Sequence, residues 1–165
     1  MDIQTNEAER KRARHLHAML LFNLVVNHIF VFLMALTLIK VSSAPMILMV
    51  ALSLSLLGYI LIKAKQSQTV EPSWFIRCHW QFAAKRARLF LILFLVLGTL
   101  SVAFFYGGHA MGLKSVAITA FSSILGLVFM VAVLAMVVME FDAEHQAKDG
   151  KIPAGAIANY PPPQA

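Results

Sequence analysis

Four long apolar runs divide this chain, and they constrain its fold more than any other feature. They cover roughly residues 18–39, 44–62, 89–106 and 115–139, and none contains Asp, Glu, Lys or Arg. Runs of about 18–25 residues match a hydrocarbon core of about 30 Å, because a helix rises 1.5 Å per residue. Helices satisfy their own backbone at that depth. The sequence therefore predicts an all-α membrane protein with four transmembrane helices.

Composition supports the membrane class. The chain of 165 residues is 59% hydrophobic and 13% charged, whereas soluble domains carry about a quarter charged residues. So few charges cannot coat a globule in water. The single cysteine, Cys78, excludes an internal disulfide, a redox cysteine pair and a thiolate-rich metal site.

Basic residues predict the orientation. Twelve of the fourteen Lys and Arg lie in the N-terminal arm, in the segment between the second and third runs, or in the C-terminal tail. Only Lys40 and Lys114 lie in the two opposite loops. The positive-inside rule then places both termini in the cytoplasm, in a plasma (inner) membrane. The first run is too long for a signal peptide's apolar region, so we expect it to be retained.

The chain divides into three predicted parts. Residues 1–17 form a cytoplasmic helical arm, in which Asn6 and Glu9 have the spacing of a capping box. Residues 18–148 form the four-helix transmembrane domain. Residues 149–165 form a Pro-rich cytoplasmic tail that is too short and irregular to build its own core.

A possible repeat relates the two halves. The sequence Lys-Arg-Ala-Arg occurs at 11–14 and at 85–88, and Lys40 and Lys114 follow at the same offset. Duplication of a helical hairpin would explain this 2+2 pattern. Basic flanks are also demanded by topology, so the match can arise by chance.

The segment before the third run predicts an amphipathic interfacial helix. It begins near Pro72, and it combines aromatic residues with basic ones. We expect it to lie at the inner membrane surface against anionic headgroups, or to dock an acidic partner. The candidate contact residues are Trp74, Arg77, Trp80, Lys85, Arg86 and Arg88.

A polar layer near the membrane midplane is the candidate intramembrane site. The first run contributes Asn23, Asn27 and His28, and the other runs contribute Ser and Thr residues. Asn23 and Asn27 share a face of an α-helix, with His28 about 100° away. The layer could bind a solute, proton or quinone. The interpretation we favour is that the layer supplies hydrogen bonds between helices.

Histidines could also bind a metal or haem. Together with a carboxylate, His17, His79 and His145 are weak candidate metal ligands near the cytoplasmic face. Four-span b-type cytochromes have similar length, but they place paired axial histidines within the spans, and only His28 lies inside one here. We expect no resident cofactor, with haem shared with another subunit as the alternative.

These patterns predict a function mainly by exclusion. The spans hold no acid–base pair, and the chain has no phosphate-binding glycine loop, which argues against an enzyme. The leading hypothesis is a structural or accessory subunit of an inner-membrane complex, in contact with lipid and other membrane subunits but not nucleic acid. The alternatives are a small oligomeric transporter or channel using the Asn27 and His28 layer, and a haem-binding membrane anchor.

Overall fold

The structure is a computed structural model that describes residues 5–38, 41–157 and 159–160. Every regular element in this part of the chain is helical. In order they are α1 (Glu7–Leu21), the π-helix η1 (Phe22–Val31), α2 (Phe32–Leu38), α3 (Ala44–Val70), α4 (Trp74–Ala110), α5 (Ser115–Lys148) and the short α6 (Ala154–Ile157).

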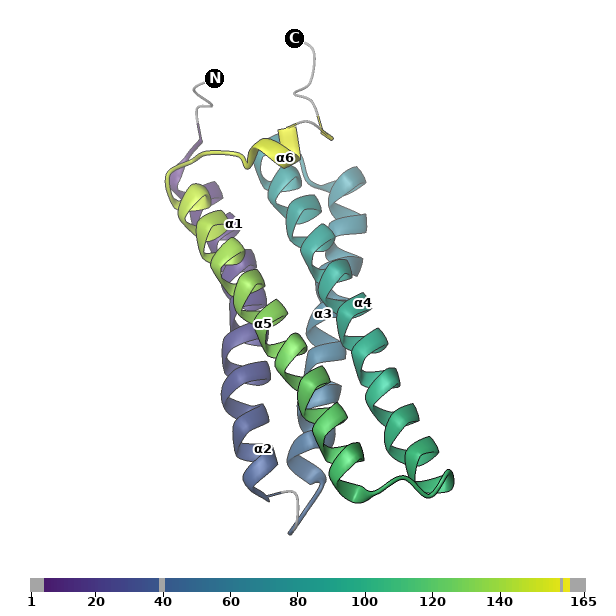
Figure 1. Ribbon diagram of the computed structural model, residues 1–165. Coiled ribbons are helices and arrows are strands. Elements are labelled where there is room, and N and C mark those ends of the chain that lie inside the picture. Colours follow the sequence, from purple (N-terminus) through teal and green to yellow (C-terminus); the bar gives the residue numbers. More distant parts are fainter. Residues whose placement is uncertain (1–4, 39–40, 158, 161–165) are drawn as a thin grey trace.

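Four helices are long and apolar enough to cross a membrane, which suggests a membrane protein. The first is the continuous rod formed by α1, η1 and α2, and the others are α3, α4 and α5. Figure 1 shows that these rods run side by side and that both termini lie at one end of the bundle. We call this the terminal end. The opposite end, with the α2–α3 and α4–α5 connections, is the hairpin end. The predicted all-helical fold with four long apolar helices is confirmed.

The helices extend well beyond the apolar runs at the terminal end. Asn6 caps α1 in a capping box with Glu9, as predicted. Gly150, with φ of 72°, follows the end of α5, where a left-handed residue commonly ends a helix. The predicted end of the first run at Ile39, and Lys40 beyond it, lie outside the described residues.

The prediction of a separate interfacial helix is wrong. α3 continues to Val70, and only residues 71–73 join it to α4. Ser73 caps α4 by accepting a hydrogen bond from the Ile76 amide, and the helix then runs unbroken for 37 residues. No proline or glycine interrupts it before Gly98, so nothing forces the bend that the prediction required.

The core fills the terminal half of the bundle. Leu20 and Leu24 from the first rod meet Ile60 of α3 and Phe90 of α4, all fully buried. Ala83 and Ala87 on α4 lie in the same cluster and take little space, which lets neighbouring helices approach closely. This half therefore holds the side chains of all four rods in fixed positions.

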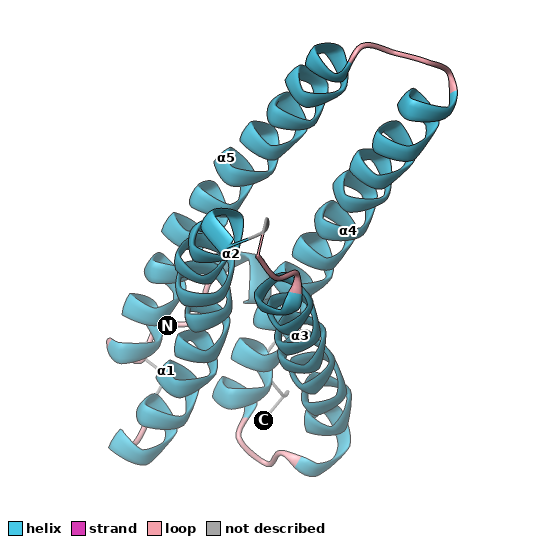
Figure 2. Ribbon diagram, turned by 90° about the horizontal axis from the view of Figure 1, so that it is seen from below, coloured by secondary structure: helices cyan, strands magenta, loops and turns pink. Residues whose placement is uncertain are grey.

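Towards the hairpin end the bundle separates into two hairpins. Among the described residues, α2 packs against η1 and α3 but not against α4 or α5. Phe104 of α4 and Phe121 of α5 pair across their own hairpin, with ring centroids 3.9 Å apart. Figure 2 shows the α4–α5 hairpin end lying away from α2 and α3.

The two Lys-Arg-Ala-Arg motifs have matching burial at three of their four positions, since both lysines and both final arginines are exposed and both alanines are buried. The second position differs. Arg12 is exposed and pairs with Glu71, whereas Arg86 is buried. A duplication of the hairpin stays a hypothesis.

The C-terminal segment packs against the bundle instead of extending from it. Ile152 and Ala156 are buried against Phe75 and Cys78 of α4. The Trp74 indole donates a hydrogen bond of 3.1 Å to the carbonyl oxygen of Tyr160. The predicted tail thus contributes to a second, smaller core, and its residues 161–165 lie outside the described part.

The core predicts a contrast between two leucines of the first rod. Leu24→Ala should lower the free energy of unfolding by about 2 kcal/mol or more, because Leu24 is fully buried and its loss leaves a cavity. Leu33, 50% exposed, is the matched control, and Leu33→Ala should change stability by less than about 0.5 kcal/mol. Unfolding in mixed detergent measures both, and equal effects would contradict this packing.

Candidate functional site

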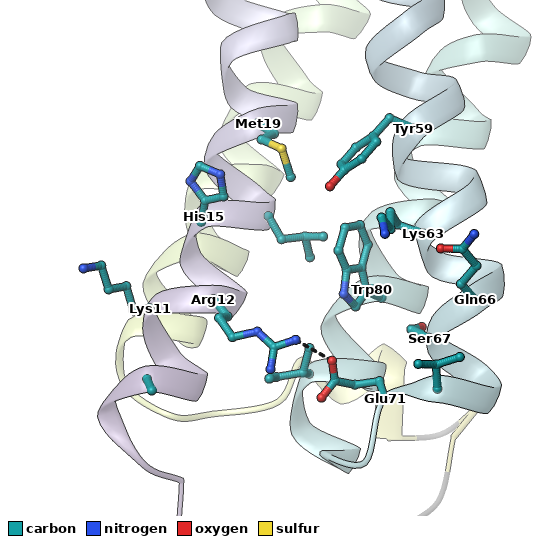
Figure 3. A pocket seen from close by; sticks show the side chains of 14 residues that line it. Lys11, Arg12, His15, Met19, Tyr59, Lys63, Gln66, Ser67, Glu71 and Trp80 are labelled. Atoms are coloured by element: carbon teal, nitrogen blue, oxygen red, sulfur yellow. Dashed lines mark hydrogen bonds and ion pairs between the residues drawn. The ribbon is translucent and has the colours of Figure 1, made fainter.

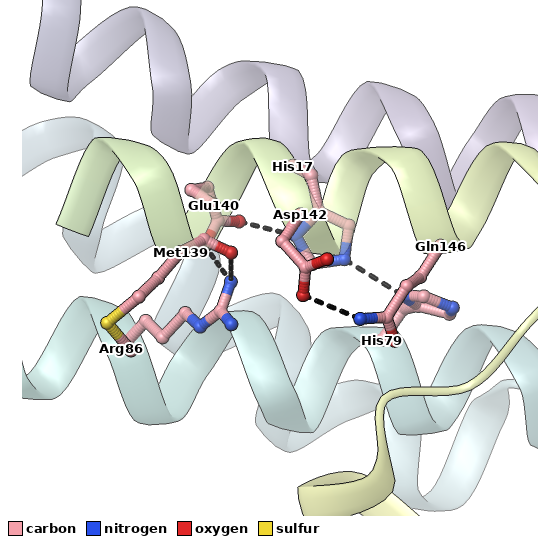
Figure 4. A network of polar contacts seen from close by, with 7 residues as sticks. All are labelled: His17, His79, Arg86, Met139, Glu140, Asp142 and Gln146. Atoms are coloured by element: carbon pink, nitrogen blue, oxygen red, sulfur yellow. Dashed lines mark hydrogen bonds and ion pairs between the residues drawn. The ribbon is translucent and has the colours of Figure 1, made fainter. Parts of the chain in front are cut away.

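A buried carboxylate joins three helices at the terminal end. Glu140 on α5 is 1% exposed and accepts a hydrogen bond of 2.8 Å from Nη1 of Arg86 on α4. Its other oxygen contacts Nδ1 of His17 on α1. Nη1 of Arg86 also donates to the Met139 carbonyl oxygen at 2.6 Å. Figure 4 shows this carboxylate between the guanidinium and the imidazole.

A second histidine extends the network towards the C-terminal segment. Nε2 of His17 lies 2.8 Å from Nδ1 of His79. Nε2 of His79 lies 3.1 Å from the carbonyl oxygen of Lys151. Both imidazoles are fully buried, and the Phe75 ring packs edge-on against His79 at 4.6 Å. We call His17, His79, Arg86 and Glu140 the terminal network.

The sequence places these groups where each apolar run meets the charged flanks. Glu140 is the first ionisable residue after the fourth run, and His17 directly precedes the first. Because the helices continue past the runs, these residues stay on helix faces that point inward. Sequence analysis missed the pairing, since nothing in one sequence shows that these positions face each other. The signal was an acid directly after 25 residues without charge.

The paired charges of this network give it a structural role. Arg86 offsets the charge of Glu140 in a site from which water is excluded. Such a pair contributes little net stability compared with an apolar replacement of both partners, but removing one partner costs about 3–5 kcal/mol. The network therefore fixes how α1, α4 and α5 sit relative to one another.

Among the described residues, the hydrogen bonds of the predicted midplane layer join the first rod to α3. Nδ2 of Asn23 donates to the Ser53 hydroxyl at 3.2 Å, and Nε2 of His28 lies 2.8 Å from the same oxygen. Nδ2 of Asn27 donates to the Met49 carbonyl oxygen at 2.9 Å. All of these side chains are buried. Ser55, Thr99, Thr119 and Ser123 are exposed and Ser101 and Ser122 half-buried, outside this layer.

The π-helix explains why three polar residues share one face. In η1 the backbone bonds close between residues five apart, so Asn23 and His28 come onto the same side. An α-helix would place residues five apart about 140° from each other, so the π-helix brings His28 closer to the face of Asn23. The His28 ring is enclosed by Phe90, Phe94 and Phe129, with ring centroids 4.7, 5.3 and 5.8 Å away.

The residues predicted to contact lipid or a partner separate into three groups. Lys85 and Arg88 are exposed. Trp74, Arg77 and Trp80 are half-buried, and Trp80 packs edge-on against Tyr59 of α3. Arg86 is buried in the terminal network, so its predicted contact with headgroups is wrong. Arg86 lies on the face of α4 that is turned towards α5, and it is therefore buried where Lys85 and Arg88 are exposed.

The three candidate metal ligands do not converge. His17 and His79 meet, but His145 is exposed on α5, where Asp149 lies 3.8 Å away. In the described part of the chain, no group of three or more His, Cys, Asp or Glu side chains is arranged to hold a metal ion.

A groove of about 680 Å³ lies between α1 and α3 at the terminal end. Its walls include Met19, Tyr59 and Trp80, and Figure 3 shows the Arg12–Glu71 ion pair, 2.6 Å long, across it. Lys11 and Lys63 also belong to its lining. The groove thus combines apolar walls with a basic rim.

Comparisons of the chain with models of protein families, with curated proteins and with solved structures found no match. The residues and their geometry therefore carry the functional argument.

The terminal network predicts unequal effects for two glutamates of α5. Glu140→Leu should lower the free energy of unfolding by about 3–5 kcal/mol, because it strands Arg86 in a buried site. Glu144→Leu is the control: Glu144 also pairs with an arginine, Arg14 at 2.7 Å, but that arginine side chain is 48% exposed. The control should cost about 1 kcal/mol or less. Equal losses in detergent unfolding would contradict the buried role of Glu140.

Proposed function

We propose that this protein is a non-catalytic accessory subunit of a membrane protein complex and that it binds its partner through the α4–α5 hairpin. The observation that carries this proposal is the exposure of α4. Only 6% of its most apolar 18-residue stretch is buried, against 33% in the first rod. Ile92, Leu95 and Val102 are each more than half exposed.

Lipid alone gives such a helix no reason to hold its position. In a bilayer, helices associate through van der Waals packing and interhelical hydrogen bonds, since lipid is as apolar as leucine. Among the described residues, α2 contacts neither α4 nor α5, and α3 does not contact α5. A partner helix would supply such contacts. The terminal half, held by its own core and network, would act as the anchor.

Transport through the midplane layer is the second candidate. The π-helix and the buried Nδ1 of His28, which has no hydrogen-bond partner among the described residues, favour it. Against it, the His28 ring is fully buried between phenylalanine rings, so water does not reach it. A transporter would purify alone as a homo-oligomer. A haem-binding anchor would show a visible absorption band that His28→Ala or His79→Ala abolishes.

We further propose that the terminal end faces the cytoplasm across the inner membrane. The basic residues gather there, as the positive-inside rule requires. Anionic headgroups would meet the exposed Lys85 and Arg88. They would also meet the basic rim of the groove.

This orientation predicts the behaviour of two reporter fusions. A reporter that is active only in the cytoplasm should work when fused after Ala165, and one that is active only outside should work when inserted near His109. Activity of neither fusion would contradict the orientation, and activity of a cytoplasmic reporter at both positions would contradict membrane insertion.

The subunit proposal predicts a site-specific crosslink. A photo-crosslinking amino acid in place of Val102 on α4 should form an adduct with a different protein in native membranes. The control is the same amino acid in place of Leu48 on α3, which is also exposed but belongs to the other hairpin, and it should crosslink mainly to lipid. Mass spectrometry identifies the adduct. A Val102 adduct with a second copy of this chain would favour the transporter instead, and no adduct would contradict the proposal.

A further inference from the structure

The terminal network has three contacts in series, but its two neutral imidazoles bring only two hydrogens to make them. Three contacts run in series: Glu140 to Nδ1 of His17, Nε2 of His17 to Nδ1 of His79, and Nε2 of His79 to the Lys151 carbonyl oxygen. Each needs one hydrogen. A carbonyl oxygen only accepts, so His79 must carry a hydrogen on Nε2.

Counting hydrogens gives the protonation of the site. Two neutral imidazoles bring two hydrogens, and an ionised carboxylate brings none. The third hydrogen is an additional proton. It can be held by His17 as an imidazolium between Glu140 and His79, or by Glu140 as a carboxylic acid. In both arrangements His79 stays neutral with its hydrogen on Nε2, every contact is made, and Glu140 still accepts from Arg86.

Without that proton one contact must fail, because two lone pairs face each other. The contacts between His17, His79 and Glu140 join rigid helices. The contact to Lys151 instead joins α4 to the connection between α5 and α6. The Lys151 contact is therefore the one that is lost.

We propose that the terminal network is a proton-binding site coupled to docking of the C-terminal segment, residues 151–157, on α4. The docked chain binds one proton more than the undocked chain. By linkage, raising the pH favours the undocked chain, by up to about tenfold per pH unit for one proton.

Two other charged groups near the segment have partners of their own. The Lys151 ammonium pairs with Asp149 at 3.1 Å and is 70% exposed. Arg10 of α1, close to Gly150, donates to the Thr5 carbonyl oxygen at 3.1 Å. The groups that face His79 in this network are therefore His17 from α1, Arg86 from α4 and Glu140 from α5.

Cys78 reports docking without any substitution. It is fully buried and packs in one cluster with Ile152 and Ala156 of the docked segment. Its sulfur also lies 3.9 Å from the Tyr160 carbonyl oxygen. A neutral maleimide can reach the thiol only when the segment leaves. Dividing the reaction rate by that of the chain unfolded in SDS at the same pH removes the effect of thiolate formation.

The experiment measures this normalised rate from pH 5 to 8.5 on the full chain in mild detergent. We expect the rate to rise with pH, with a slope of up to about tenfold per unit. A chain ending at Gly150 should react rapidly, with no dependence of the normalised rate on pH. A normalised wild-type rate that does not change with pH, or that is too slow to measure at every pH, would overturn the proposal.

Two variants separate proton coupling from loss of structure. His79→Leu removes the contact with the Lys151 carbonyl oxygen, so its normalised rate should be high at every pH. Glu140→Gln supplies the third hydrogen from its amide without taking up a proton, so its normalised rate should be low at every pH. His145→Leu changes an exposed histidine and should keep the wild-type slope. A Glu140→Gln chain with the wild-type slope would also overturn the proposal.

Discussion

The buried carboxylate of Glu140 is the interaction on which the arrangement of the terminal half depends. It contacts the guanidinium of Arg86 on α4 and the imidazole of His17 on α1, and Glu140 itself is 1% exposed. An unpaired charge there would be strongly unfavourable, so alternative registers of these helices are penalised. Apolar packing alone has no such directionality. The network therefore selects one packing among the many that leucine-rich helices allow.

From this fixed end the structure becomes progressively less constrained. The midplane layer ties only the first rod to α3, through Ser53 and the Met49 carbonyl. Beyond it α2 contacts neither α4 nor α5 in the described part of the chain. One end is specified by polar contacts and the other presents apolar surface, and the proposed subunit would use that surface to bind its partner.

Sequence reasoning located the helices because hydrophobic length and helix signals are local. The four apolar runs and the Asn6 capping box are each readable from consecutive stretches of the sequence. Sequence reasoning failed where tertiary contacts determine the position or burial of a side chain. Arg86 belongs to a basic cluster typical of a membrane surface, yet its position opposite Glu140 buries it. The π-helix moved His28 onto the face of Asn23, and no propensity in the sequence indicates that change of period. The docking of Ile152 and Ala156 likewise depends on a surface that α4 forms only in the folded chain.

The most direct test of the account is a double-mutant cycle between Arg86 and Glu140. Arg86→Leu and Glu140→Leu should each destabilise the chain strongly. The double variant should lose much less than the sum, with a coupling free energy of about 3 kcal/mol in mixed-detergent unfolding. Additive losses would mean that the two side chains do not meet, and the network could not be what positions α1, α4 and α5.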